Sequence, residues 1–230
     1  MAVIIFYIVL GMGIVFLPKY IRYSGSTYKV ASGNSFFITV LDKGNYGEFL
    51  TYSMLESLKV PHKLMSNLYI PREDGTTTEL DLIMIAETGI YVFESKNYSG
   101  WIFGDERYKN WTQTLPNKQK YKFFNPIWQN KAHIKALEAV IGIEDKELTK
   151  SYIIFSERCT LKKINVISPF VRVIKRDSLM RTLKQEMIES RKVLSLNQID
   201  RIYFSLKPYT LADAATKQAH IEAIKTKATV

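Results

Sequence analysis

Acidic side chains interrupt two strand-like apolar segments of this sequence. Asp81 precedes the run Leu-Ile-Met-Ile, and Glu94 follows the run Tyr-Val-Phe and is itself followed by Ser95 and Lys96. A buried carboxylate needs a cation or hydrogen-bond donors, because removing its charge from water is unfavourable. In an antiparallel pair joined by a tight turn, Glu94 and Lys96 share one face, and Asp81 can lie opposite them. The spacing therefore predicts a shared cation, with an ion pair between Glu94 and Lys96 as the alternative.

The candidate ligands of this cation are oxygen atoms. The carboxylates of Asp81 and Glu94, a backbone carbonyl and water suit Mg²⁺ or Mn²⁺, and no His or Cys ligand favours zinc. Such an ion polarises a phosphodiester and lowers the pKa of its bound water. Lys96 supplies a positive charge that stabilises the attacking hydroxide or the developing phosphorane charge. The predicted chemistry is metal-dependent hydrolysis of phosphodiester bonds.

Further short motifs surround these residues. In chain order they are Gly44-x-x-Gly47-Glu48, Glu79-Leu80-Asp81, the segment 89–97, the segment 100–104, Trp111 and the segment 125–129. Their order resembles the nuclease-related domain of the PD-(D/E)xK nuclease superfamily, over roughly residues 42–141. Leu80 stands where the superfamily name has proline, at a position that is not a metal ligand.

The resemblance implies an α/β fold of the restriction-endonuclease type, in which helices flank a central mixed β-sheet. It implies Mg²⁺ or Mn²⁺ held by Asp81, Glu94 and the backbone carbonyl of Ser95. Glu48 would complete the acidic cluster, and Gln129 would assist, with a solvated or helix-capping amide as the alternative for Gln129. The implied activity is that of a Mg-dependent deoxyribonuclease. The alternative is a nuclease-fold module that lacks useful catalysis and binds nucleic acid or a partner at a membrane.

Hydrophobic periodicity predicts the elements that position these residues. A helix with Glu48 in its first turn ends before Pro61, and a meander of strands follows at 63–70, 78–86 and 90–94. Residues 100–124 are rich in aromatics and lysines without clear periodicity, which indicates a long loop or irregular hairpin. The later elements are helices at 125–141, 177–189, 195–206 and 211–224 and strands at 151–155 and 170–174.

The chain of 230 residues carries a formal net charge of +10, which favours a polyanionic partner. Lys118, Lys120 and Lys122 alternate with polar or aromatic side chains, a pattern that suits phosphate contact and base stacking. A solvated loop and anionic lipid are the alternatives for this segment. We expect DNA rather than RNA as the nucleic acid. A homodimer is common among nucleases that cut both strands, but the sequence carries no interface signal.

Two residues outside these motifs are given structural interpretations. His133 lies one helical turn beyond Gln129 and could approach the site, but we interpret it as a surface histidine, which is the more common case. Cys159, the single cysteine, permits no intramolecular disulfide, which fits a reducing compartment. We interpret it as a half-buried structural thiol.

The first residues predict a membrane anchor. Residues 2–17 carry no charge, and Pro18, Lys19 and Arg22 follow them. At 1.5 Å per residue these residues reach about 24 Å, short of a hydrocarbon core of about 30 Å, so the interface would have to hold Tyr20 and Tyr23. A cleaved signal peptide is the alternative, although the segment lacks a basic start. The positive charges after it indicate a single-pass protein of the cell membrane with its soluble domain in the cytoplasm.

The expected organisation has four parts. Residues 1–23 form the anchor and residues 24–41 a connector. Residues 42–155 form the nuclease-like domain, and residues 156–230 form an α/β extension that completes or flanks it.

Overall fold

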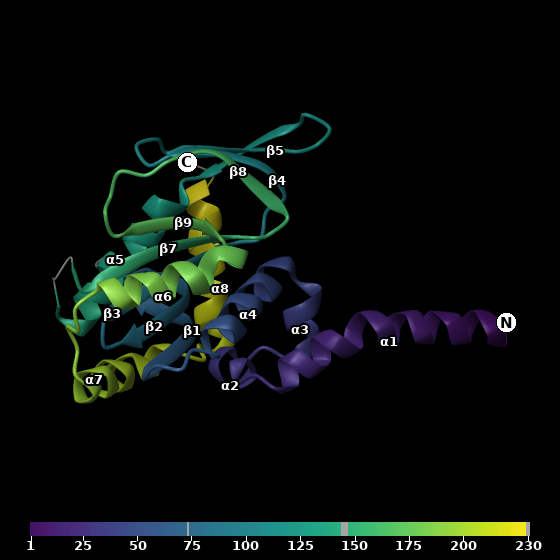
Figure 1. Cartoon of the computed structure of the whole chain (residues 1–230), viewed down its shortest axis with the longest axis horizontal. Coiled ribbons are helices and arrows are strands. Elements are labelled where there is room, and N and C mark those ends of the chain that lie inside the picture. The colour runs from purple at the N-terminus through teal and green to yellow at the C-terminus, as the bar shows by residue number, and fades with distance from the viewer. Residues whose placement is uncertain (73, 144–146, 229–230) are drawn as a thin grey trace.

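A mixed five-stranded β-sheet lies at the centre of the computed structural model, which describes residues 1–72, 74–143 and 147–228 (Figure 1). Its first three strands form an antiparallel meander, and its last two run parallel to the third. In spatial order the strands are β1 (His62–Pro71), β2 (Thr77–Ala86), β3 (Gly89–Lys96), β7 (Thr149–Phe155) and β9 (Val171–Lys175). The predicted α/β class, with a central mixed sheet and an antiparallel meander, is confirmed.

Helices cover both faces of this sheet, which explains the nearly continuous apolar runs in β2, β3 and β7. On one face, Phe93 packs in a cluster with residues of α4 (Lys43–Leu55) and α6 (Leu179–Glu189). On the other, Val92 packs with residues of α5 (Pro126–Ile141) and α7 (Leu196–Leu206). Neighbouring residues of β3 therefore contribute to opposite halves of the core.

Capping residues next to them in the sequence define where the two helices nearest the predicted site begin. Asp42 caps α4 by accepting a hydrogen bond from the Asn45 amide at 2.8 Å. Asn125 caps α5 in the same way through the Ile127 amide at 2.9 Å, and Pro126 occupies the first helical position. Helix α5 agrees with the sequence prediction in both bounds, and α4 begins a turn before the apolar pattern that predicted it.

A second, four-stranded sheet contains the segment 100–124, where a long loop or irregular hairpin was expected. Its spatial order is β6 (Lys120–Phe124), β5 (Asn110–Thr114), β4 (Gly100–Asp105) and β8 (Cys159–Asn165). Only one of its faces is buried: Trp111 stacks on Phe155 of the central sheet with ring centroids 6.2 Å apart, and Ile102 is fully buried beside them. The long-loop prediction was wrong, whereas the irregular hairpin given beside it agrees with the antiparallel pairing of β4, β5 and β6. The strand was hard to predict because β6 is an edge strand that is almost wholly exposed, so burial does not follow its alternation of lysine and aromatic side chains.

The same packing explains the residue types at positions 104 and 159. A Cβ atom on Gly104 would lie 2.1 Å from the Trp111 ring, so only glycine admits that ring. Cys159 begins β8, which was not predicted, and it is more deeply buried than expected, with 2% exposure. Burial raises the pKa of its thiol to about 11, as expected of an unreactive structural cysteine.

The apolar N-terminal segment forms helix α1 (Ala2–Ser24), which projects away from the two sheets (Figure 1). It runs through Pro18, where the sequence suggested an end, and by length and composition it is able to cross a membrane. A signal sequence would meet the same criteria. Tyr23 lies in the core against Phe49 instead of at a membrane interface, and its hydroxyl donates to the Asn34 carbonyl at 2.5 Å.

Short helices fill the remaining parts of the chain. Between α1 and α4 lie α2 (Tyr28–Ser32) and α3 (Phe36–Leu41), and Tyr28 is fully buried. The last part of the chain forms η1 (Arg176–Ser178), α6, α7, η2 (Lys207–Tyr209) and α8 (Ala214–Ala228). The three helices predicted there are therefore present, with bounds shifted by a few residues.

Candidate active site

Strands β2 and β3 stop pairing where the predicted acidic residues lie. Leu82 and Phe93 form the last registered pair, and continuation of that register sets Asp81 opposite Glu94. Beyond Leu82 and Phe93 the two strands are no longer paired. There Asp81 Oδ2 accepts a hydrogen bond from the Ser95 amide at 2.9 Å. We call this place the strand fork. It brings the carboxylate of Asp81 to the end of β3 that carries Glu94 and Lys96.

Glu94, Lys96 and Gln129 form a connected polar chain beside the strand fork. Glu94 is 2% exposed, and its Oε1 lies 2.7 Å from Lys96 Nζ. Lys96 Nζ also donates to Gln129 Oε1 at 3.0 Å. The ion pair between Glu94 and Lys96, which was the alternative to a shared cation, is therefore present. The Gln129 side chain contacts this ion pair and does not cap the helix. Burial lowers the pKa of Lys96, but the Glu94 carboxylate outweighs it, so the pKa is raised and the ammonium stays charged.

His133 is a member of this cluster, as its alternative interpretation held, and the preferred interpretation as a surface histidine was wrong. It is 5% exposed, its Nδ1 lies 2.7 Å from Thr78 Oγ1, and its Nε2 lies 3.2 Å from Glu94 Oε2. Burial raises the pKa of Glu94, but Lys96 and His133 outweigh it, so the pKa lies below its ordinary value. The spacing to Gln129 was the available signal, because residues four apart on a helix share one face.

Glu48 brings a third carboxyl group to the site from the opposite face of the central sheet. It lies in the second turn of α4, not in the first as predicted, because the helix begins at Lys43, and it is half-buried. Burial and the charges of Glu79 and Glu94 raise the pKa of Glu48 to about 8. Burial and the charges of Glu94 and Glu48 likewise raise the pKa of Asp81. The three acids therefore act on one another electrostatically, although no direct hydrogen bond joins them among the described contacts.

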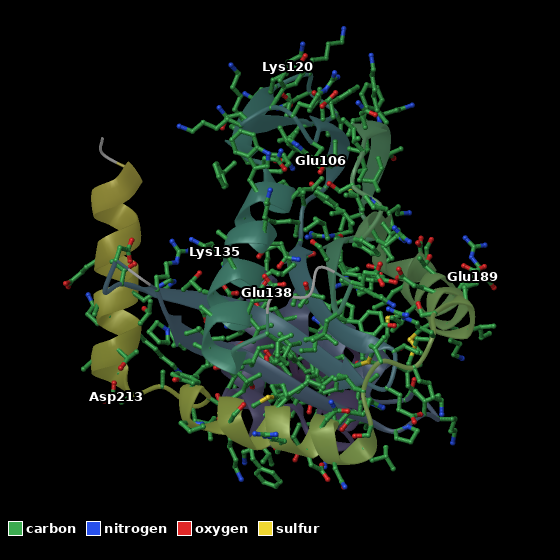
Figure 2. The ribbon with its side chains drawn as sticks, turned by 90° about the vertical axis from the view of Figure 1, so that its left-hand side faces the viewer. Glu106, Lys120, Lys135, Glu138, Glu189 and Asp213 are labelled. Atoms are coloured by element: carbon green, nitrogen blue, oxygen red, sulfur yellow. The ribbon has the colours of Figure 1, made fainter. Side chains whose placement is uncertain are left out.

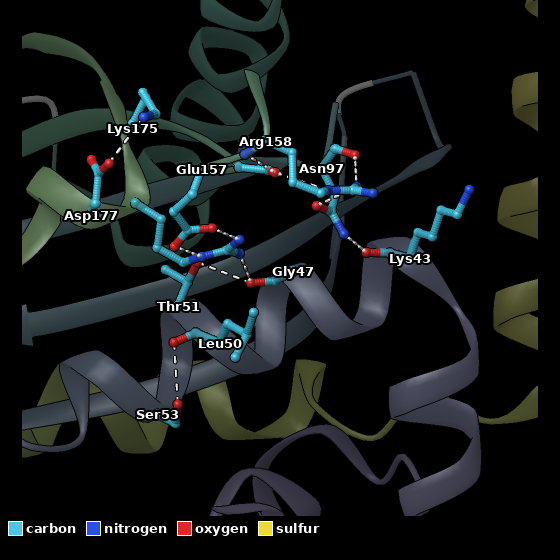
Figure 3. A network of polar contacts seen from close by, with 12 residues as sticks. Lys43, Gly47, Leu50, Thr51, Ser53, Asn97, Glu157, Arg158, Lys175 and Asp177 are labelled. Carbon is cyan, nitrogen blue, oxygen red and sulfur yellow. Dashed lines mark hydrogen bonds and ion pairs between the residues drawn. The ribbon is translucent and has the colours of Figure 1, made fainter. Parts of the chain in front are cut away.

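A network of polar contacts anchors α4 next to the strand fork (Figure 3). The Gly47 carbonyl accepts a hydrogen bond from Arg176 Nη1 at 2.9 Å. Asn97, which follows β3, donates through Nδ2 to the Lys43 carbonyl, and Arg158 Nη2 donates to the Asn97 carbonyl at 2.8 Å. These contacts attach the helix that carries Glu48 to the end of the strand that carries Glu94. Sequence reasoning did not find them, because Gly47 and Arg176 are 129 positions apart and no local pattern relates them.

The donor set at the strand fork fits a hard divalent cation. Glu94 Oε2 is buried and, among the described residues, receives no hydrogen bond of good geometry; the contact from His133 satisfies only the distance. No three His, Cys, Asp or Glu side chains of the described chain form a ready metal cluster. A cation here would therefore rely on two carboxylates, a backbone carbonyl and water. These are the oxygen ligands that Mg²⁺ and Mn²⁺ accept.

The three predicted nucleic-acid-binding lysines lie apart from this cluster, on the second sheet. Lys118 occupies the turn between β5 and β6, with a positive φ of 66°. Lys120 and Lys122 are exposed on β6. In Figure 2, Lys120 lies at the top of the molecule, above Lys135 and Glu138 of α5.

The mixed sheet, the acid at the strand fork and the Glu-x-Lys of the next strand define the class of nuclease-like α/β proteins. The sequence profile of the nuclease-related domain matches residues 43–156, from the start of α4 to just beyond β7. An uncharacterized protein of Bacillus anthracis is 36% identical over 188 residues, which cover 80% of this chain and 85% of that protein. No solved structure shows a significant match. The chain belongs to the nuclease-related domain family.

Proposed function

We propose that this protein is a membrane-anchored, metal-dependent nuclease that hydrolyses phosphodiester bonds in DNA. The observation that carries the proposal is the meeting of Asp81, Glu94 and Lys96 at the strand fork. Metal-dependent hydrolysis of a phosphodiester uses carboxylate oxygens to bind the cation and a positive charge to stabilise the negative charge that develops on the phosphate. The carboxylates and the lysine at the strand fork provide both. Membership of a nuclease-related family supports the same conclusion.

Asp81, Glu94 and the carbonyl of Ser95 are the proposed ligands of Mg²⁺ or Mn²⁺. The carbonyl is included because the N–H and C=O of a strand residue point to the same side, and the Ser95 N–H points to Asp81. The bound ion supplies polarisation of the phosphodiester and a lowered pKa of its water. The pKa of Glu48 is raised to about 8, and a cation held by these ligands would favour its ionised form.

Lys96 and its partners are the groups of the chain itself that would stabilise negative charge on the substrate. The raised pKa of Lys96 excludes it as a general base at neutral pH and suits it to stabilising negative charge on a substrate oxygen. Gln129 orients the ammonium group from α5, and His133 orients Glu94 from the next turn of that helix. Such positioning matters because a displaced charged group loses much of its effect on the transition state.

Helix α1 is the proposed anchor, with the catalytic domain in the cytoplasm. Its first part is exposed and apolar, whereas Lys19 and Arg22 follow on the domain side, as the positive-inside rule requires. Arg22 Nε donates to Ser53 Oγ of α4 at 3.0 Å, so the anchor continues into the domain without a flexible connection. This arrangement would confine cleavage to nucleic acid that reaches the membrane surface.

The test is cleavage by the full chain in non-ionic detergent micelles. Labelled single-stranded DNA, double-stranded DNA and RNA are incubated with Mg²⁺, Mn²⁺ or EDTA. We expect cleavage of DNA by the parent with either cation, and loss of cleavage in Asp81→Asn and Lys96→Gln. Asp200→Asn is the matched control, because Asp200 is an exposed carboxylate paired with Lys63 far from the strand fork.

The outcomes separate the two functional hypotheses. If Asp81→Asn cleaves like the parent, the proposed site is wrong. If the parent is inactive with both cations yet still binds nucleic acid, the protein is a nuclease-fold binding module instead of an enzyme. Cleavage of RNA in preference to DNA would refute the substrate assignment alone.

A further inference from the structure

The second sheet buries one face and exposes the other. Ile102 and Trp111 lie on the buried face. The strand register defines two rows on the opposite face, which we call the outer face. The first row is Lys120, Thr114, Trp101 and Thr160, and the second begins with Lys122, Thr112 and Phe103.

Trp101 is the central feature of the outer face. Its side chain is 51% exposed, although tryptophan is among the side chains that gain most from burial. It lies on an inner strand of the sheet, between Thr114 of β5 and Thr160 of β8, so its neighbours within the row are small side chains. Lys162 Nζ of β8 lies 5.1 Å from the centre of its ring, a cation–π contact.

Positive charge flanks this tryptophan on both edges of the sheet. Lys120 and Lys122 stand on β6, and Lys162 stands on β8. With strands about 4.8 Å apart, the two edges are separated by about 14 Å. Within the described rows the side chains between them are threonines and aromatics, and no carboxylate occurs.

The acids at the end of β4 do not neutralise the outer face. Asp105 pairs with Arg107 at 2.6 Å, and Glu106 accepts hydrogen bonds from the amides of Ile167 and Ser168 at 2.6 and 2.9 Å. Both carboxylates are therefore engaged locally. The lysines of the outer face remain available to an anionic partner.

We propose that the outer face binds single-stranded nucleic acid, with a base stacked on Trp101 and phosphates bound by Lys120, Lys122 and Lys162. Exposed aromatics on a sheet flanked by cationic side chains suit unpaired bases, because a free base offers its whole face to an aromatic ring. In a duplex that face is already stacked on neighbouring bases. The inference rests on the proposed function only in taking nucleic acid as the substrate class, and it adds a binding surface separate from the carboxylates.

Binding is measured with the full chain in detergent micelles and a fluorescein-labelled 12-nucleotide oligothymidine. EDTA is present, so that binding is observed without cleavage. Trp101→Leu removes the stacking ring and keeps an apolar side chain. Tyr108→Leu is the matched control, because Tyr108 is a 62% exposed aromatic in the turn after β4, outside both rows. Thermal unfolding of each variant checks that the fold is intact.

We expect Trp101→Leu to weaken binding of the oligonucleotide by about 5- to 150-fold, and Tyr108→Leu to leave it unchanged. Lys120→Gln combined with Lys122→Gln should reduce the slope of log affinity against log salt by about 1.4, whereas Trp101→Leu should not change that slope. Equal affinities of the parent and Trp101→Leu would overturn the proposal. An equal loss on duplex DNA of the same length would also overturn it, because stacking on a free base would not be the cause.

Lipid binding is tested on the same variants with vesicles that contain phosphatidylserine. If Trp101→Leu loses vesicle binding and keeps oligonucleotide binding, the outer face is a lipid surface and the proposal fails. Failure of this inference can be distinguished from failure of the proposed function. Binding that depends on Trp101 in a protein that never cleaves would retain this inference and refute the nuclease, whereas cleavage with binding independent of Trp101 would do the reverse.

Discussion

The ion pair between Arg176 and Glu157 joins two side chains of very different exposure, 5% for Arg176 and 45% for Glu157. The guanidinium donates to the Glu157 carboxylate at 2.9 and 2.6 Å and to the Gly47 carbonyl at 2.9 Å. Arg176→Met leaves behind a carboxylate that water can reach and a carbonyl that still accepts a hydrogen bond from Thr51 Oγ1. Glu157→Met leaves behind a buried guanidinium. The two substitutions should therefore differ, although they break the same pair.

The magnitudes follow from that difference. In Arg176→Met the lost bond from a charged donor to the Gly47 carbonyl contributes about 1.5–3 kcal/mol, and the half-exposed ion pair at most about 1 kcal/mol. We expect a loss of about 3 kcal/mol in the free energy of unfolding. For Glu157→Met we expect about 4 kcal/mol, because a buried charge without its partner costs about 3–5 kcal/mol. The double variant should lose only about 3 kcal/mol, since it leaves no unpaired charge in the interior.

The assay is urea unfolding of the full chain in micelles at pH 7, followed by tryptophan fluorescence. A smaller loss for Glu157→Met than for Arg176→Met would refute the reasoning, as would additive losses in the double variant. A pH series adds a second check. The hydrogen bond from Arg176 lowers the pKa of Glu157 below its ordinary 4.5. The ion pair therefore stabilises the fold above pH 4.5, and the difference between parent and Glu157→Met should narrow as the pH falls below that value.

Four further results are expected. Mn²⁺ at a hundred times its Kd should stabilise the parent by about 2.7 kcal/mol and leave Asp81→Asn unchanged in thermal melts; equal shifts would place the ion elsewhere. His133→Gln should weaken Mn²⁺ binding by about 10- to 100-fold in calorimetry, whereas substitution of the half-buried His62 by Gln should not. Gly104→Ala should destabilise the protein by about 1–3 kcal/mol in urea, because its Cβ meets Trp111, and a tolerated alanine would contradict the packing. Deletion of residues 2–17 should release the chain from membranes washed with alkaline carbonate, and retention would refute the anchor.

Much of the strand fork was predictable because its members are close in the sequence. The tight turn at Gly89, where φ is 130°, joins β2 to β3, and alternation along the strands then places Glu94 and Lys96 on one face. Asp81 and Ser95, whose contact defines the fork, are only 14 positions apart. Short-range patterns also determined α5, because its cap and its first proline lie next to it in the sequence.

The rest depended on contacts between distant parts of the chain. Strand β4 pairs with β8, from Gly100 beside Cys159 onward, and no periodicity within residues 100–124 contains that partner. The spacing of His133 to Gln129 placed it on the same face of α5, but its contact with Glu94 became evident only when the face of α5 that meets β3 was known. The outer face exists because Trp111 packs inward on Phe155 and leaves Trp101 outside.

The physical reason is that sequence patterns act between residues close together in the chain, whereas tertiary packing joins residues that are far apart in it. Turn chemistry, helix capping and side-chain alternation act over a few residues, so residue types and their order established the candidate chemistry of Asp81, Glu94 and Lys96. Burial is a property of the whole chain, because a side chain is removed from water only by segments that arrive from elsewhere. The resemblance had already implied that Glu48 joins the acidic cluster. Tertiary packing alone decided that His133 supports Glu94 and that Arg176 holds the helix that carries Glu48.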